Sequence, residues 1–240
     1  MSSGTRIPYA VAHSIGRYVT QTLLKVAGSD IERAAVDQMD DVGSLRRQKD
    51  TIGDLEVLAP YPTRGGKDDA IGWDHDPLFR VLNRIVDNPL AKPKKPAAVL
   101  WLANQSDPPE PESIVLGTAV KGLKPGFKAA SITLRAKVGE VTLEVFRAEH
   151  DAYGWAQIMR TGPEDFGIHF LTQWKRRHGI AFGDEQKASV DGFLMDADGK
   201  RVSVPTERDA FAKCGMEYVE PHERARWIER VKIEREVMKR

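Results

Sequence analysis

A glycine-serine pair followed closely by a pair of carboxylates constrains this chain more than any other feature. Gly43-Ser44 precedes Arg46-Arg47, and Gly53 then leads into Asp54-Leu55-Glu56 at the start of an apolar run. If that run is a β-strand, its period of two places Asp54 and Glu56 on the same face. The pattern therefore predicts a turn, a short basic helical segment and a strand that carries two carboxylates on one side.

These residue types suggest a particular chemistry. Two carboxylates fixed on a rigid face form a hard-oxygen site of the kind that holds Mg²⁺. The backbone N–H groups after Gly43-Ser44 and the side chain of Arg47 offer contacts to phosphate oxygens. Either half alone is a weak signal, since both patterns occur often by chance. Together they predict a site for a nucleoside triphosphate and a divalent cation.

The combination resembles the nucleotidyltransferase superfold, and within it the palm of the family X DNA polymerases, the DNA polymerase beta-like group. The resemblance covers most of residues 6–224, in order. In the first part it rests on Arg6-Ile7-Pro8, on the Gly43 to Leu58 segment, and on Leu143-Glu144-Val145-Phe146 followed by Asp151. In the second part it rests on Thr161-Gly162-Pro163-Glu164-Asp165-Phe166, Pro205 to Phe211, and Glu217 to Arg224.

The resemblance implies an α+β protein: a nucleotidyltransferase palm, with a mixed sheet and helices, over residues 1–150. A mainly helical thumb with a small hairpin follows over residues 151–240, and binds nucleotide and DNA. The family bends its thumb at a cis peptide bond. Here that bond is Gly162-Pro163, and because cis costs little before proline, we expect it to be cis.

The resemblance also implies the site residues. Asp54, Glu56 and Glu144 would be the catalytic carboxylates and the ligands of two Mg²⁺ ions, with Mn²⁺ as a substitute or the preferred ion. The nucleotide-binding residues would be Arg6, Gly43, Ser44, Arg47, Gly53, Thr161, Gly162, Glu164 and Gly167. The DNA-binding residues would be Lys128, Lys175 and Arg176.

Several positions depart from the family pattern. The three carboxylates are usually aspartates, so Glu56 and Glu144 add a methylene to a cage in which Mg²⁺ needs near-ideal octahedral geometry. An arginine two residues before the third carboxylate is replaced by Thr142, and a Tyr-Phe pair by Met159-Arg160. Gly167 stands where an asparagine contacts the incoming base. We expect catalysis to survive, with altered fidelity and sugar discrimination.

Composition is consistent with these expectations but does not strengthen them. The 36 basic and 35 acidic residues nearly cancel, which argues mildly against tight sequence-independent DNA binding. The single cysteine, Cys214, excludes an internal disulfide and a cysteine-rich zinc site, and we expect it to fill the core. No apolar run reaches transmembrane length, so we expect a cytoplasmic monomer, of bacterial or viral origin, without membrane contacts.

Periodicity and turn residues predict the main elements. We expect helices over 8–27 and after Asp76, and strands over 33–39, 54–59, 97–102, 113–119, 128–136 and 140–147. From 153 onward we expect helices, interrupted by a hairpin that turns at Asp198-Gly199. An apolar stripe in the last 16 residues predicts a further helix packed on the thumb.

The expected activity is that of a DNA-directed DNA polymerase. It would use deoxynucleoside triphosphates to add deoxynucleotides to a primer 3′-hydroxyl in a primer-template or gapped duplex. We expect it to fill gaps during DNA repair. The enzyme would be a minimal form that consists of a palm and a thumb and lacks a lyase domain. Two alternatives stay open. One is a small-molecule nucleotidyltransferase similar to the aminoglycoside adenylyltransferases. The other is a catalytically inactive DNA-binding relative that has lost metal.

Overall fold

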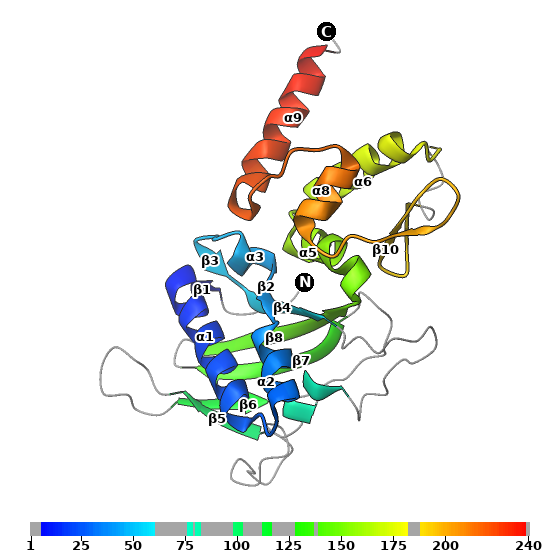
Figure 1. The fold of residues 1–240 in the computed structure, drawn as a ribbon. Helices are drawn as coiled ribbons and strands as arrows, with labels where there is room; N and C mark the ends of the chain where they lie inside the picture. The colour runs from blue at the N-terminus through cyan, green and yellow to red at the C-terminus, as the bar shows by residue number, and fades with distance from the viewer. Residues whose placement is uncertain are drawn as a thin grey trace.

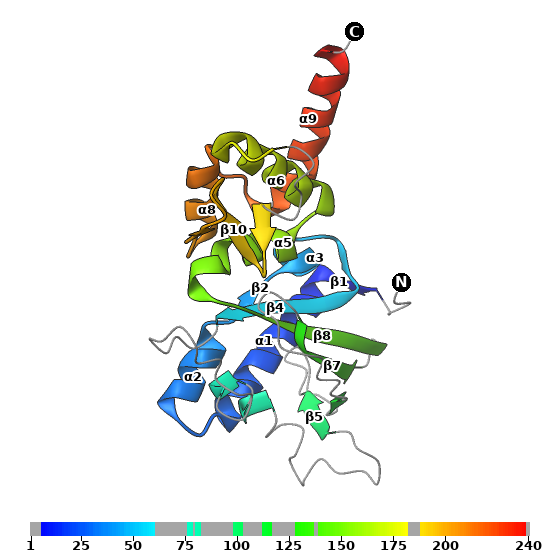
Figure 2. The ribbon, with the colours of Figure 1, turned by 90° about the vertical axis from the view of Figure 1, so that its right-hand side faces the viewer.

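The computed structural model describes residues 6–60, 76–78, 80–82, 98–102, 112–116, 128–136, 139–181 and 188–238. It is an α+β protein, as the sequence predicts. Figures 1 and 2 show a first part, built around a sheet with helices α1 and α2, and a largely helical second part from which helix α9 projects.

The central sheet has four strands in the order β2-β4-β8-β7. They comprise Asp40–Asp41, Asp54–Pro60, Gly139–Ala148 and Lys128–Ala136, respectively. Strands β4 and β8 run parallel, whereas β2 is antiparallel to β4 and β7 is antiparallel to β8. The expected strands over 54–59, 128–136 and 140–147 are therefore confirmed.

One face of this sheet packs against α1, Tyr9–Val26, which matches the expected helix over 8–27 (Figure 2). Helix α1 buries a stripe at helical spacing, and the strands contribute every second residue, as amphipathic elements must when they share a core. The buried members of this cluster include Ala12, Ile15, Val19, Leu23, Leu55, Val57, Leu143 and Val145. The alternate residues of β4 and β8 are thereby placed on the opposite face.

The strand expected over 33–39 is wrong, because Asp30–Asp37 forms helix α2. Local chemistry explains the difference. The Ser29 hydroxyl accepts a hydrogen bond from the backbone N–H of Glu32, and the Glu32 carboxylate accepts one from Gly28. Such reciprocal capping stabilises a helix start, and Ala34-Ala35 favours helix over strand.

Several short elements surround the Gly43-Ser44 turn. Strand β1, Ile7–Pro8, pairs with β3, Thr51–Ile52. Between them in sequence, the one-turn helix α3 comprises Gly43–Arg46, and Gly43 has a positive φ of 64°. Strands β5, Ala98–Leu102, and β6, Glu112–Leu116, form a separate antiparallel pair, near the expected positions. Asp76 caps the following helical turn as expected, because its carboxylate accepts from Leu78 N–H.

The second part is mainly helical. After a 3₁₀ turn, His150–Ala152, come α5 (Tyr153–Thr161) and α6 (Glu164–His178), and later α8 (Glu207–Cys214), a 3₁₀ turn (Pro221–Glu223) and α9 (Arg224–Met238). A small sheet pairs β9 (Ser189–Val190), β10 (Phe193–Met195) and β11 (Arg201–Val202), with the expected turn at Asp198-Gly199. The Gly162-Pro163 peptide bond is cis, as predicted.

The two parts have separate cores that a small cluster joins. Aromatic side chains dominate the second core, where Phe166, Phe170, Trp174 and Phe211 are almost fully buried and the lone cysteine is also buried. Val42, Leu58, Phe146, Ala148 and Ala156 join the far face of the sheet to α5. Of the C-terminal stripe, Ile228 is buried, but Val237 is exposed, so α9 packs on the second core only near its start. None of the described helices is long and apolar enough to cross a membrane.

Candidate functional site

The three predicted catalytic carboxylates lie on adjacent positions of the central sheet. In the parallel pairing of β4 with β8, Glu56 is the direct partner of Glu144, and Asp54 is the partner of Thr142. Their odd-numbered neighbours Leu55 and Leu143 are buried toward α1. The carboxylates therefore lie on the other face, toward α5, and each is only partly exposed.

The pKa of Glu56 responds both to its burial and to its acidic neighbours. Burial, followed by the negative charges of Asp54 and Glu144, raises the pKa of Glu56 from 4.5 to about 7. The positive charges of Arg160 and Arg47 act in the opposite direction. This arrangement disfavours three negative charges in the absence of a cation. Extra positive charge at the site would relieve that cost.

Gly43 permits the close approach of Glu56 to the turn. A Cβ atom at position 43 would lie 1.7 Å from Glu56 Oε2 and 2.7 Å from its Cδ, distances that no side chain could keep. The positive φ of Gly43 also favours glycine. Gly43 thus leaves space for the Glu56 carboxylate of β4.

Ser44 and Arg47 present buried polar atoms beside the carboxylates. The Ser44 hydroxyl and the Arg47 Nε have no hydrogen-bond partner among the described residues, although both atoms are buried. Arg47 Nη1 donates to the carbonyl of Thr161 and lies close to Gly162. Burial lowers the pKa of Arg47, whereas Glu56 and Asp54 favour its charged form. Buried polar atoms without partners are costly, so they mark a place where a polar ligand fits.

A buried ion cluster fastens this turn to the second part. Both terminal nitrogens of Arg46 donate to the Glu207 carboxylate at 2.7 Å, and Arg224 Nη2 donates to it at 3.0 Å. Burial opposes ionisation of Glu207, but the two arginines outweigh it and lower its pKa. Arg46 also donates to Thr161 Oγ1 at 2.8 Å. Helices α3, α8 and α9 are thereby held together around one carboxylate.

The predicted nucleotide-binding residues near the start of α6 occupy different environments. Thr161 and Gly162 are buried at the end of α5, and Gly162 has a positive φ of 65°. Glu164 is exposed at the first position of α6, where a carboxylate is favoured by the helix dipole. Gly167 is buried, and a Cβ there would lie 3.1 Å from Met159 Sδ. The turn Thr161-Gly162 is thus brought to Arg47, while Glu164 faces solvent.

The remaining predicted residues are more scattered. Arg6 is exposed just before β1, and Gly53 lies between β3 and β4 with open space around its Cα. Lys175 is only 7% exposed, so its side chain does not lie on the surface as a DNA contact would. Arg176 next to it is exposed, and Lys128 begins β7. Lys175 and Arg176 are adjacent in sequence but differ in exposure, so they do not lie together on one surface.

Three residues of the site were not assigned by sequence reasoning. Glu207 and Arg224 lie in segments that resemble the end of the thumb, but nothing in their spacing indicates a shared ion cluster with Arg46. Arg160 was recognised only as a departure from the family pattern. Its Cζ lies 3.9 Å from the centre of the Phe146 ring, which places a cation on the carboxylate face. Its position directly before Thr161-Gly162 was the available signal.

The carboxylates do not form a ready-made metal cage. Within the part of the chain that the structure describes, no three His, Cys, Asp or Glu side chains are grouped as a metal site. The donor set itself suits a hard cation, since three carboxylates share one face. Burial and then the acidic neighbours raise the pKa of Glu56.

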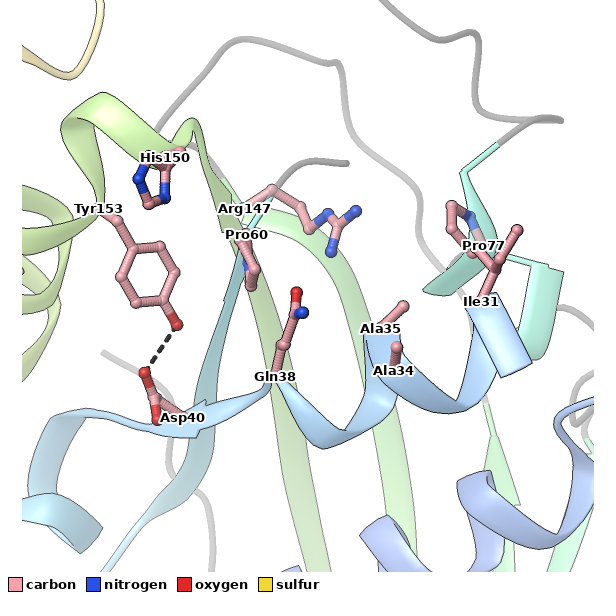
Figure 3. Close-up of a pocket in the computed structure, with 10 residues that line it drawn as sticks. All are labelled: Ile31, Ala34, Ala35, Gln38, Asp40, Pro60, Pro77, Arg147, His150 and Tyr153. Atoms are coloured by element: carbon pink, nitrogen blue, oxygen red, sulfur yellow. Dashed lines mark hydrogen bonds between the residues drawn. The ribbon is translucent and has the colours of Figure 1, made fainter. Parts of the chain in front are cut away.

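A cavity of about 730 Å³ lies elsewhere, at the opposite ends of β4 and β8 (Figure 3). It is lined by residues of α2, by Pro60 and Arg147 at the ends of the two strands, and by Tyr153. The Tyr153 hydroxyl donates to Asp40 at 2.8 Å, and Arg147 forms a buried ion pair with Asp76. The predicted carboxylates Asp54, Glu56 and Glu144 are not among the residues that line this cavity.

Comparison with known proteins adds no assignment. No protein-family model matches the sequence, and no curated protein is significantly similar to it.

Proposed function

We propose that this chain is a DNA polymerase of the family X type, with a nucleotidyltransferase palm and a helical thumb. It would add deoxynucleotides to the 3′-hydroxyl of a primer, as in the filling of short gaps. The observation that carries the proposal is the direct pairing of Glu56 with Glu144, next to the Gly43-Ser44 turn. This pairing joins the two halves of the sequence resemblance, which lie almost 90 residues apart.

The carboxylates have the chemistry of a two-ion site. Asp54, Glu56 and Glu144 would hold two Mg²⁺ ions, or Mn²⁺, and these would supply positive charge to the attacking and leaving oxygens of the transfer. The longer side chains of Glu56 and Glu144 give their carboxylates more freedom than aspartates would have. We therefore expect Mn²⁺, which tolerates less regular coordination, to support the reaction better than Mg²⁺.

The buried donors suit a triphosphate. Ser44 Oγ and Arg47 Nε lack partners within the described structure, and both lie at the turn beside Glu56. They would donate to phosphate oxygens and orient the triphosphate for in-line transfer. Gly43 keeps the turn close to the metal-binding carboxylates. The polar atoms are buried, so their hydrogen bonds to an anion would be strong.

The ion cluster around Glu207 would position the thumb. Because Arg46 adjoins Arg47, and also donates to Thr161, the cluster fixes the phosphate-binding turn relative to the Thr161-Gly162 turn. A nucleotide held between the two turns would have its triphosphate on one and its sugar near the other. The motifs from Thr161 to Arg224, which resemble a polymerase thumb, argue against the small-molecule alternative.

Primer extension tests the proposal. The full chain would be incubated with a duplex containing a one-nucleotide gap, all four deoxynucleoside triphosphates, and either Mg²⁺ or Mn²⁺. We expect extension of the primer by one nucleotide, with higher rates in Mn²⁺. Adenylylation of an aminoglycoside without extension would favour the small-molecule enzyme, whereas duplex binding without turnover would favour the inactive relative.

A further inference from the structure

Arg160 places a cation on the same face of the sheet as the carboxylates. It lies near the end of α5, and its Cζ is 3.9 Å from the centre of the Phe146 ring. Phe146 follows Glu144 by two positions on β8, so the two side chains lie on the same face about 7 Å apart along the strand. A guanidinium stacked on that ring is within reach of the carboxylate next to it.

The charges around Arg160 identify its role. Burial lowers the pKa of the guanidinium, and Glu56 and Glu144 are the charges that oppose this effect. Reciprocally, Arg160 is the cation that most favours ionisation of Glu56, ahead of Arg47. Arg47 has its own acceptor in the Thr161 carbonyl. Arg160 is therefore the principal positive charge facing the paired glutamates within the described structure.

A divalent cation and this guanidinium compete for the same negative charge. Glu56 and Glu144 are direct neighbours on adjacent strands, about 4.8 Å apart at their backbones. A metal ion bound by both carboxylates would lie a few ångströms from a guanidinium that neutralises them. In a partly buried site, like charges at that distance repel strongly. Metal binding then requires Arg160 to withdraw from the pair.

We propose that Arg160 is a resident counter-ion that stabilises the metal-free Glu56–Glu144 pair and weakens the binding of divalent cations there. The effect on the binding of divalent cations rests on the proposed function, whereas the counter-ion role does not. The arginine makes the site stable without metal and raises the cation concentration needed to load it. It is a positioning residue that acts through the glutamates.

The predicted competition with metal is tested by titrating the full chain with Mn²⁺ alone and measuring the binding by isothermal titration calorimetry. Arg160→Gln should bind Mn²⁺ about tenfold more tightly than the wild type, whereas Arg160→Lys, which keeps the charge, should stay near the wild-type affinity. Arg201→Gln is the matched control, because Arg201 stacks on Phe193 at 4.0 Å in the thumb hairpin. Its affinity for Mn²⁺ should be unchanged.

The counter-ion part is tested without metal. A double-mutant cycle of Arg160→Gln and Glu144→Gln, measured by urea unfolding in EDTA, should show that Arg160→Gln costs less stability in the Glu144→Gln background than in the wild type. Equal costs in the two backgrounds would overturn the counter-ion role, whatever the metal titration shows. Glu56→Gln in place of Glu144→Gln gives a second cycle with the same expectation, should one variant fold poorly.

The outcomes separate this inference from the proposed function. Equal Mn²⁺ affinities in wild type and Arg160→Gln would overturn the competition while leaving a metal-dependent polymerase standing. Binding by Arg160→Gln alone would support competition in its strongest form. If neither protein binds Mn²⁺, both the competition and the two-ion site are wrong. Coupling between Arg160 and Glu144 in the double-mutant cycle would then show that Arg160 is a purely structural counter-ion.

Discussion

Glu56 and Glu144 are direct partners in the parallel pairing of β4 with β8, on the face of the sheet that turns away from α1. Burial, together with the negative charges of Asp54 and Glu144, raises the pKa of Glu56. Such an arrangement is unfavourable for stability alone. The protein surrounds it with Arg47, Arg160 and the glycine of the Gly43-Ser44 turn, and the proposed function gives each of these residues a role.

Glu144→Gln tests the third carboxylate. The substitution preserves the size of the side chain, so the fold should persist, with an unfolding transition close to that of the wild type. Nucleotide incorporation on a gapped duplex should fall at least a thousandfold, because a neutral amide binds divalent cations poorly. Primer extension and circular dichroism measure the two effects. A variant with wild-type activity would remove Glu144 from the mechanism.

The stability of the metal-free protein should depend on the protonation of Glu56. Its pKa is raised to about 7 in the folded state, so folding favours the protonated form. The contribution is fully present below about pH 4.5, the ordinary value, and is lost as the pH rises through 7. We expect Glu56 to lower the free energy of unfolding by about 2 to 3 kcal/mol across that interval.

Urea unfolding in EDTA at several pH values measures this effect. Glu56→Gln should remove most of the decline between pH 4.5 and 7, because glutamine does not titrate. An unchanged pH profile in that variant would contradict the assignment of the raised pKa to Glu56. Divalent cation should also flatten the profile, since it favours the ionised carboxylate.

Gly43→Ala should damage activity more than stability. Its positive φ costs about 1 to 2 kcal/mol for a residue with a Cβ, and the new methyl group would displace the Glu56 carboxylate. Gly179→Ala is the matched control, because Gly179 has a similar φ of 67° with nothing within 4 Å of a built Cβ. Both variants should lose similar stability in urea, but only Gly43→Ala should lose primer extension.

Glu207→Gln should destabilise the protein by about 3 kcal/mol, because it leaves the buried charge of Arg224 and the partly buried charge of Arg46 without their carboxylate. Asp165→Asn provides the comparison. It removes an exposed ion pair with Lys232, and should cost less than about 1 kcal/mol. Chemical denaturation of both variants measures the difference. Equal losses would show that the Glu207 cluster contributes little beyond a surface pair.

Ser44→Ala should reduce nucleotide use without reducing stability. The hydroxyl makes no hydrogen bond within the described structure, so its removal should change the free energy of unfolding by less than about 0.5 kcal/mol. A lost bond to a phosphate oxygen costs about 1.5 to 3 kcal/mol, so kcat/KM should fall tenfold to a hundredfold. Ser14→Ala, an exposed helical serine, should change neither quantity.

Local pattern was sufficient for many elements of the fold. The apolar spacing of α1, the alternation in β4 and β8, and the Asp198-Gly199 turn each depend on neighbours a few residues away, and they were predicted correctly. The wrong prediction of a strand over 33–39 also has a local cause. The capping interactions of Ser29 and Glu32 favour α2, and a pattern of alternate apolar residues is too weak a signal over so short a stretch.

The sequence by itself determined which residues share a face of one strand, because the period of a strand is a property of the backbone. It thus placed Asp54 with Glu56 next to a glycine turn. Only the tertiary structure decided that Glu144 pairs with Glu56, that Arg160 faces both, and that Glu207 joins Arg46 to Arg224. Strand register and helix docking are set by packing between segments far apart in the chain, and no local pattern encodes them.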